Sequence, residues 1–202
     1  MRCSGVVPFR NWLATILALV SVSLAHADDM QGLRAGNYTF SDELGGFKIL
    51  GVTGLGTRAN PIVVRQELTS SSPVTMVIRS AAPPLQDSDV GDLGTGALHL
   101  RISIVNASGQ AWVEFEFELQ EILHHASIFS DGLSFDQRRE NLDSVHSTLF
   151  AKYSRDFEPF DRMRFVEGKV DPEQQVEFEF PLTDFTPRWT FYLVQDPRIP
   201  SS

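Results

Sequence analysis

The stretch that decides the fold reads Val113-Glu114-Phe115-Glu116-Phe117-Glu118-Leu119. Apolar and acidic residues alternate strictly along it, and successive side chains of a β-strand point to opposite faces. A strand here would turn its apolar side chains toward a core and its glutamates toward water. The same period of two returns at residues 98–104 and 176–180. The sequence therefore predicts several strands, each with one buried face.

Shorter apolar runs, rich in valine, isoleucine and aromatic residues, continue this pattern at residues 47–52, 61–68, 74–78 and 189–194. Clusters of glycine, serine, proline and asparagine separate the runs, as at residues 54–56, 70–73, 83–84 and 106–109. Such clusters are typical of turns. Many short strands at this spacing indicate an all-β fold, and we expect an antiparallel β-sandwich of the immunoglobulin or jelly-roll kind.

One hairpin can be placed in register from the residues alone. If residues 106–109 form a four-residue loop, Val105 pairs with Gln110 and Arg101 meets Glu114, with both apolar sets on one face. We interpret the glutamates of the second strand as a solvated outer face. An acidic surface that binds calcium or a basic partner is the alternative.

The segment from residue 127 to residue 165 breaks the alternation. Apolar residues recur there at spacings of three and four, namely Leu142, Val145, Leu149 and Tyr153. This spacing predicts either a short amphipathic helix, preceded by a capping box from Ser134 to Gln137, or a long irregular excursion between strands. The segment is also rich in arginine, whereas acidic residues crowd the flanking strands. We therefore expect it to lie over a sheet edge.

The first 27 residues have the layout of a secretory signal peptide. Arg2 and Arg10 precede an apolar run of about 13 residues, whereas a bilayer-spanning helix needs roughly 20. Ala25-His26-Ala27 then supplies small residues where a signal peptidase cuts. We expect cleavage after Ala27, export to the periplasm or the medium, and no membrane span in what remains. A retained membrane anchor is the alternative.

The chain is acidic, with 17 basic and 26 acidic side chains among 202 residues and a formal net charge of −9. Loss of Arg2 and Arg10 with the signal peptide would leave 15 basic and 26 acidic groups, a net charge of −11. Such a chain is repelled by phosphate backbones and by anionic lipid, so we expect neither nucleic acid nor a bare membrane as a partner.

The domain organisation follows from the same boundary. Residues 28–202 are predicted to form a single β-sandwich domain, of which residues 28–90 are either a part or a separate N-terminal β layer. The only cysteine, Cys3, lies inside the predicted signal peptide. The exported domain would therefore hold together by packing, without disulfides.

Calcium is the metal that the loops favour most, although turn chemistry explains the same residues without an ion. A first glycine-containing loop brings together Asp87, Asp89 and Asp92, and a second offers Asp131 and Asp136. Neither loop has the ligand spacing of an EF-hand. We therefore predict no cofactor and no metal, with calcium at these five aspartates as the alternative.

Tryptophan, serine and histidine are the remaining candidates for binding and catalysis. Trp112 shares the parity of Glu114, which indicates an outward-facing aromatic and a weak ligand-binding candidate, whereas Trp189 alternates with Phe191 and reads as core. No Gly-x-Ser-x-Gly motif occurs, and we predict no catalytic residues. His124-His125 with His146 would make a zinc site only with a further ligand from elsewhere.

The second half of the chain combines three characteristic motifs, Asn106-Ala107-Ser108-Gly109-Gln110-Ala111-Trp112, Asp131-Gly132-Leu133-Ser134-Phe135-Asp136 and Val166-Glu167-Gly168-Lys169-Val170-Asp171-Pro172. With them, residues 98–198 resemble exported bacterial β-sandwich domains of unassigned activity. These domains occur in surface proteins, including some with a PEP-CTERM sorting signal. The resemblance implies a fold and an exported location, but no activity. Unlike the anchored members, the sequence has no apolar helix after residue 196, so attachment by that route is not expected.

From these observations we expect an exported, noncatalytic structural or binding module of the cell envelope or extracellular space, with a protein or a glycan as its ligand. Two alternatives remain open at this point. One is a secreted hydrolase on the same scaffold, and the other is a calcium-stabilised adhesion module.

Overall fold

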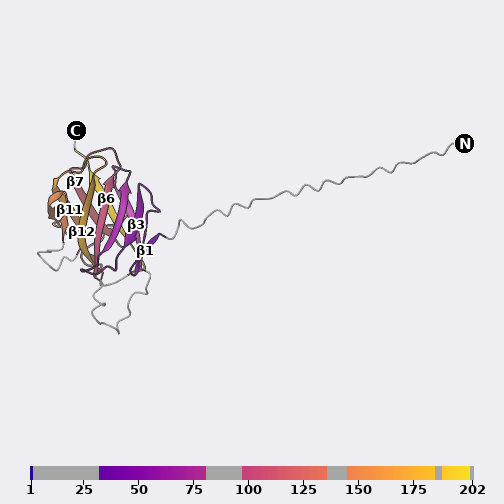
Figure 1. The fold of residues 1–202 in the computed structure, drawn as a ribbon. Helices are drawn as coiled ribbons and strands as arrows, with labels where there is room; N and C mark the ends of the chain where they lie inside the picture. The colour runs from indigo at the N-terminus through magenta and orange to yellow at the C-terminus, as the bar shows by residue number, and fades with distance from the viewer. Residues whose placement is uncertain (2–31, 81–96, 136–144, 185–187, 201–202) are drawn as a thin grey trace, which may run out of the picture.

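A computed structural model describes Met1 and residues 32–80, 97–135, 145–184 and 188–200 (Figure 1). The rest of the predicted signal peptide lies outside this part of the chain, and so do the calcium candidates Asp87, Asp89, Asp92 and Asp136. The described residues are all-β and contain no helix, so none of them forms a helix that could cross a membrane.

Among these residues, one sheet has seven strands, and we name it sheet A. Its spatial order is β1 (Leu33–Ala35), β2 (Tyr38–Ser41), β5 (Val74–Ser80), β13 (Thr190–Arg198), β7 (Glu114–Gln120), β11 (Arg162–Gly168) and β10 (Phe150–Ser154). Neighbouring strands of sheet A are antiparallel throughout.

The second sheet, named sheet B, follows the order β3 (Phe47–Thr53), β4 (Ile62–Leu68), β6 (Ala97–Asn106), β12 (Gln175–Asp184) and β8 (Leu133–Ser134), and β9 (His146–Ser147) also pairs with β12. The β4–β6 pair is parallel, so the expectation of a purely antiparallel sandwich is wrong at this pair. The physical reason is that β5, which lies between them in the sequence, belongs to sheet A. The chain therefore returns to sheet B in its original direction.

The two sheets pack face to face through aromatic side chains. Phe115 and Phe117 of β7 meet Phe178 of β12 with ring centroids 4.7 Å and 5.2 Å apart, and Phe117 lies 4.9 Å from Phe180. All four rings are fully buried. The alternation of residues 113–119 and 176–180 thus produces facing apolar surfaces, and the predicted all-β fold with one buried face per strand is confirmed.

The predicted hairpin between residues 98–105 and 110–119 is wrong. β6 pairs with β4 and β12 in sheet B, whereas β7 pairs with β13 and β11 in sheet A. Arg101 consequently meets Glu179 of β12 and not Glu114. Residues that face one core show the same alternation whether their strands are neighbours in one sheet or lie in opposite sheets. Periodicity therefore could not distinguish the two arrangements.

The predicted helix is not present in the described part of the excursion. Ser134, the expected cap, belongs to β8, and residues 146–147 and 150–154 form β9 and β10. Of the apolar residues at helical spacing, Tyr153 pairs with Phe165 of β11, while Leu142 lies outside the described residues. Pairing with β11 and β12 satisfies backbone groups here, and this outweighs a spacing of three and four.

This excursion closes one side of the sandwich, in agreement with its expected place at a sheet edge. β9 of sheet B lies against β10 of sheet A, and on the other side β1 lies against β3. Covering both sides in this way limits pairing of the edge strands with other chains.

A buried amide pair joins the two sheets inside the apolar core. Gln66 of β4 and Gln195 of β13 are fully buried. Gln66 Nε2 donates to Gln195 Oε1, and Gln195 Nε2 lies 3.5 Å from Gln66 Oε1. Each amide therefore satisfies polar atoms that would otherwise be buried without a partner.

We predict that Gln66→Leu lowers the free energy of unfolding by about 1–3 kcal/mol, because it leaves the amide of Gln195 buried and unpaired. The double variant Gln66→Leu/Gln195→Leu should recover most of this loss, since it removes both polar groups. Urea unfolding of the two variants and the wild type measures the difference. Losses that simply add in the double variant would contradict the role of the amide pair.

Candidate functional site

The outer face of sheet A carries rows of charged side chains across β11, β7 and β13. The alternation that buries the phenylalanines of β7 turns its glutamates outward. The register then sets Arg162 opposite Glu118, and it sets Arg164 and Asp196 on either side of Glu116. We name this surface the arginine–carboxylate face, which consists of Glu114, Glu116, Glu118, Arg162, Arg164, Asp196 and Arg198.

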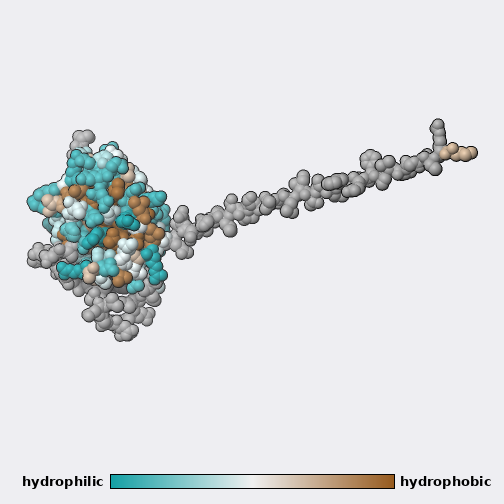
Figure 2. Space-filling model, in the orientation of Figure 1, coloured by the Kyte–Doolittle hydropathy of each residue, from teal (hydrophilic) through white to brown (hydrophobic). Residues whose placement is uncertain are grey.

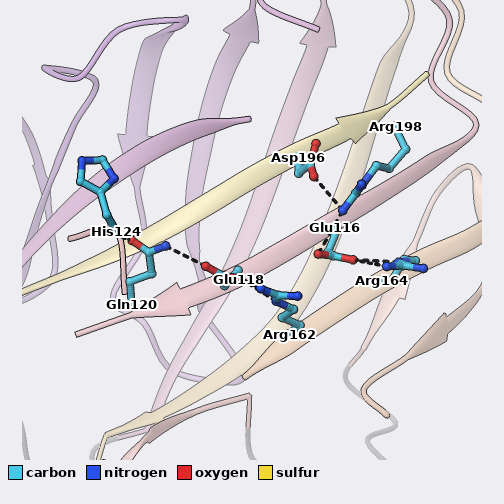
Figure 3. Close-up of polar contacts among 8 residues, drawn as sticks. All are labelled: Glu116, Glu118, Gln120, His124, Arg162, Arg164, Asp196 and Arg198. Carbon is cyan, nitrogen blue, oxygen red and sulfur yellow. Dashed lines mark hydrogen bonds and ion pairs between the residues drawn. The ribbon is translucent and has the colours of Figure 1, made fainter. Parts of the chain in front are cut away.

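Glu116 is the centre of this face (Figure 3). Arg164 donates to its Oε2 from Nε at 2.8 Å and lies 2.7 Å away through Nη2. Arg198 Nη2 lies 3.4 Å from Glu116 Oε1 and 2.9 Å from Asp196 Oδ2. The Glu116 side chain is only 6% exposed, so two guanidinium groups compensate a carboxylate that is nearly removed from water.

The same pattern continues one row along β7. Arg162 Nε donates to Glu118 Oε2 at 2.6 Å, and Gln120 Nε2 donates to Glu118 Oε1 at 2.7 Å. Gln120 Oε1 in turn accepts the backbone N–H of His124 at 2.8 Å. The hydrogen-bond network therefore extends from the arginine–carboxylate face to the turn that follows β7 (Figure 3).

Aromatic rings hold two of the arginines from the side. Arg164 Cζ lies 4.9 Å from the ring centroid of Phe157, and Arg162 Cζ lies 5.1 Å from that of Phe160. Both distances are within the range of cation–π contact. Ion pair and ring together fix the plane of each guanidinium group.

The arginines form the outermost layer of this face. The Arg162 and Arg164 side chains are both 34% exposed, more than the glutamates they cover. Their ion pairs use Nε and Nη2, so within the described part of the chain the Nη1 N–H groups take no part in them. These N–H groups are therefore additional hydrogen-bond donors in the outermost layer.

The interpretation of the glutamates as a solvated outer face is therefore wrong in one respect. They point outward as predicted, but arginines cover Glu116 and Glu118. Two of these arginines, Arg162 and Arg164, come from the arginine-rich excursion. Their alternation at positions 162 and 164 was a signal that could have placed them on one face. Which glutamates they meet follows only from the strand order.

Both tryptophan predictions are wrong. Trp112 is fully buried, and its indole N–H donates to Ser108 at 3.1 Å, so it is not an exposed ligand-binding side chain. Trp189 is 56% exposed and not part of the core. Both residues lie just outside a regular strand, since β7 begins at Glu114 and β13 at Thr190. The parity of a strand does not extend past its end.

The calcium candidate within the described residues is Asp131. Its Oδ2 accepts the backbone N–H of Ile128 at 3.0 Å, and its Oδ1 accepts that of Leu133 at 3.1 Å. These bonds are ordinary turn chemistry. The described residues contain no group of three histidine, cysteine, aspartate or glutamate side chains placed to hold a metal ion. His124, His125 and His146 are among these residues, so they do not form such a group.

Two carboxyl groups in the described residues have a raised pKa at separate places. Burial raises the pKa of Asp196, and Glu116 and Glu118 add to the rise, while Arg198 and Arg164 oppose it. Burial also raises the pKa of Glu121, which pairs with Arg188 at 2.8 Å. Asp196 adjoins Glu116, and five residues along β7 separate that position from Glu121 by about 16 Å.

Comparison of the chain with protein-family models finds no match, and comparison with curated proteins finds none either. The geometry of the arginine–carboxylate face is therefore the basis for a functional proposal.

We predict that Glu116→Ala lowers the free energy of unfolding by about 1.5–3 kcal/mol, because it removes charge-assisted hydrogen bonds from a buried carboxylate. Glu114→Ala is the matched control on the same strand. Its carboxylate is 41% exposed and lies 4.0 Å from Arg164. The control should change stability by at most about 1 kcal/mol. Urea unfolding measures both variants, and equal losses would contradict this account of Glu116.

Asp196→Asn should change how stability depends on pH. A raised pKa in the folded state contributes stability below the unfolded pKa, and this contribution is lost as pH rises through the folded pKa. The wild type therefore loses this stability contribution between acidic and neutral pH. An asparagine does not titrate, so the variant has no such contribution. The stability of Asp196→Asn relative to wild type should rise from pH 3 to pH 7, as measured by urea unfolding.

The control for this experiment is Asp171→Asn, which alters a carboxylate that is 58% exposed. It measures the effect of the same substitution at an exposed position. A flat difference for Asp196→Asn over the same pH range would refute the assignment of a raised pKa to this group.

Proposed function

We propose that this chain is an exported, noncatalytic binding module of the periplasm or extracellular space. Its ligand is a neutral glycan that lies across the arginine–carboxylate face of sheet A. The observation that carries the proposal is the layer of guanidinium groups, each fixed by a carboxylate and two of them also by an aromatic ring, with Nη1 donors left over.

The chemistry of this face suits a hydroxyl-rich polymer. Sugar hydroxyl groups can accept hydrogen bonds from the exposed arginines, and they can donate to Glu114, whose side chain is 41% exposed. Exposed Phe160 beside Arg162 offers a ring for stacking against a sugar. The side chains are already held in place by one another, so little conformational entropy is lost on binding.

The near balance of charge favours a neutral glycan over an anionic one. The face combines three arginines with four carboxylates, and its carboxylates would repel an added anion. A protein with complementary side chains is the other ligand class, and arginine and aromatic residues are common at protein interfaces. The arginine donors are spaced regularly along β11, and this spacing favours a glycan as the ligand.

A binding role is also supported over the hydrolytic one by the positions of Asp196 and Glu121. Carboxyl groups that flank a glycosidic bond stand about 5–10 Å apart, whereas the backbone positions of these two residues are about 16 Å apart along the sheet. The resemblance to exported bacterial β-sandwich domains supports the exported location and a sandwich of the immunoglobulin or jelly-roll kind. The exported location and the kind of sandwich are, like the ligand, proposals.

The test is thermal unfolding of the exported chain with soluble neutral polysaccharides, namely dextran, laminarin, xylan and mannan. A polysaccharide that binds the folded state must raise the midpoint, by an amount equivalent to about 2.7 kcal/mol at 100 times its dissociation constant. Arg162→Gln should weaken this binding about tenfold, because it removes a charged donor.

Arg101→Gln is the matched control, since Arg101 forms a similar ion pair with Glu179 on the outer face of sheet B. It should leave the midpoint shift unchanged. Absence of a shift with all four polysaccharides would overturn the glycan proposal. An equal reduction of the midpoint shift in both arginine variants would show that the arginine–carboxylate face of sheet A is not the binding site.

A further inference from the structure

The outer face of sheet B includes two opposite charges that have no ion pair. Arg65 of β4 and Glu177 of β12 stand on either side of Ser103 of β6, in one row of the sheet. Arg65 is exposed and Glu177 is half-buried. Their backbone positions are two strand spacings, or about 10 Å, apart. Within the described part of the chain, neither side chain forms an ion pair with any other group.

The guanidinium group of Arg65 lies over the backbone of the edge strand β3. A Cβ atom added at Gly51 would come 3.0 Å from Arg65 Nη2. The register between β3 and β4 shifts just before this glycine, between Ile49 and Gly51. The side chain therefore extends away from Glu177, and its N–H groups remain available to a carboxylate of another molecule.

The central strand of this face, β6, presents small or neutralised side chains. Ser103 is buried, and its hydroxyl accepts a hydrogen bond from Gln175 Nε2 at 2.9 Å. Val105, one row along, is half-buried and uncharged. In the row on the other side, Arg101 pairs with Glu179 at 2.7 Å. The unpaired charges of the central row therefore lie on the strands that flank β6.

Charge on this face is balanced, although the chain as a whole has a formal net charge of −9. The outer face of β3, β4, β6 and β12 carries three cations and three carboxylates, namely Lys48, Arg65, Arg101, Glu67, Glu177 and Glu179. A face without net charge attracts neither a strongly basic nor a strongly acidic partner. It also reduces the repulsion between two acidic copies of the chain that meet there.

The arrangement is complementary to itself. A two-fold axis parallel to β6 exchanges the positions of β4 and β12, because these strands lie on opposite sides of β6. Arg65 of one copy then faces Glu177 of the second, and the reverse contact forms as well. One row along, Glu67 faces the side-chain amide of Gln175. A two-fold interface repeats each contact in this way, so both unpaired charges find partners.

The size of the face indicates a reversible association. Four strands of about seven residues cover about 440 Å² in plan, whereas stable interfaces take about 800 Å² from each partner. Over the region where Figure 1 labels β6 and β3, Figure 2 shows hydrophobic residues in brown scattered among hydrophilic residues in teal. Interfaces that form reversibly have such a mixed surface.

We propose that two copies of this chain associate through the outer faces of their B sheets, with the Arg65–Glu177 ion pair formed twice across a two-fold axis. The arginine–carboxylate face lies on the other side of the sandwich, because the two sheets pack through their inner faces. The dimer therefore leaves both arginine–carboxylate faces uncovered and directs them away from each other.

The test is sedimentation equilibrium of the exported chain, with its N-terminus established by mass spectrometry, from about 10 μM to about 1 mM. The wild type should pass from monomer to dimer within this range. Arg65→Glu and Glu177→Arg should each raise the dissociation constant at least about tenfold, because like charges then face each other twice. An equimolar mixture of the two variants should dimerise like the wild type, because each contact again joins opposite charges.

Lys169→Glu is the matched control. It makes the same change of charge as Arg65→Glu at a side chain that is 57% exposed and follows β11 of sheet A. It should dimerise like the wild type, and thermal unfolding shows whether each variant is folded. The proposal is overturned if the wild type stays monomeric throughout the range, if either single variant dimerises like the wild type, or if the mixture of folded variants does not dimerise.

Discussion

Contact between the phenylalanines of β7 and those of β12 is the interaction on which the rest of the structure depends. The rings of Phe115, Phe117, Phe178 and Phe180 join the two sheets across the core. Because strand side chains alternate, burying these rings forces the intervening glutamates onto the outside. The chemistry of the outer face of sheet A is thus a direct consequence of the packing inside.

The outward glutamates of β7 repel one another, and the strand order places arginines beside them. Like charges repeated along one strand repel one another, and β7 is central in sheet A, where neighbouring strands crowd it. β11 supplies Arg162 and Arg164 on one side, and β13 supplies Arg198 on the other. The ion pairs so formed fix guanidinium groups in defined planes. The same arrangement that stabilises the sheet therefore prepares a surface for recognition.

The fold was predictable to the level of its strands, and the errors have a common physical origin. Periodicity reports which face of a strand is buried, but it contains no information on the neighbour of that strand. The hairpin between β6 and β7 therefore satisfied every local test, although the two strands belong to different sheets. Residues at strand ends were misjudged for a related reason. Trp112 and Trp189 lie beyond the ends of β7 and β13, so the parity of those strands does not predict their burial.

The sequence by itself determined the all-β class, the alternation that separates phenylalanine from glutamate, and the positions of most strands. These are local properties, because each depends on residues that are neighbours in the chain. Only the tertiary structure decided that Arg164 meets Glu116. It alone made β4 run parallel to β6. Such features depend on pairing between segments far apart in the sequence, which no local pattern records.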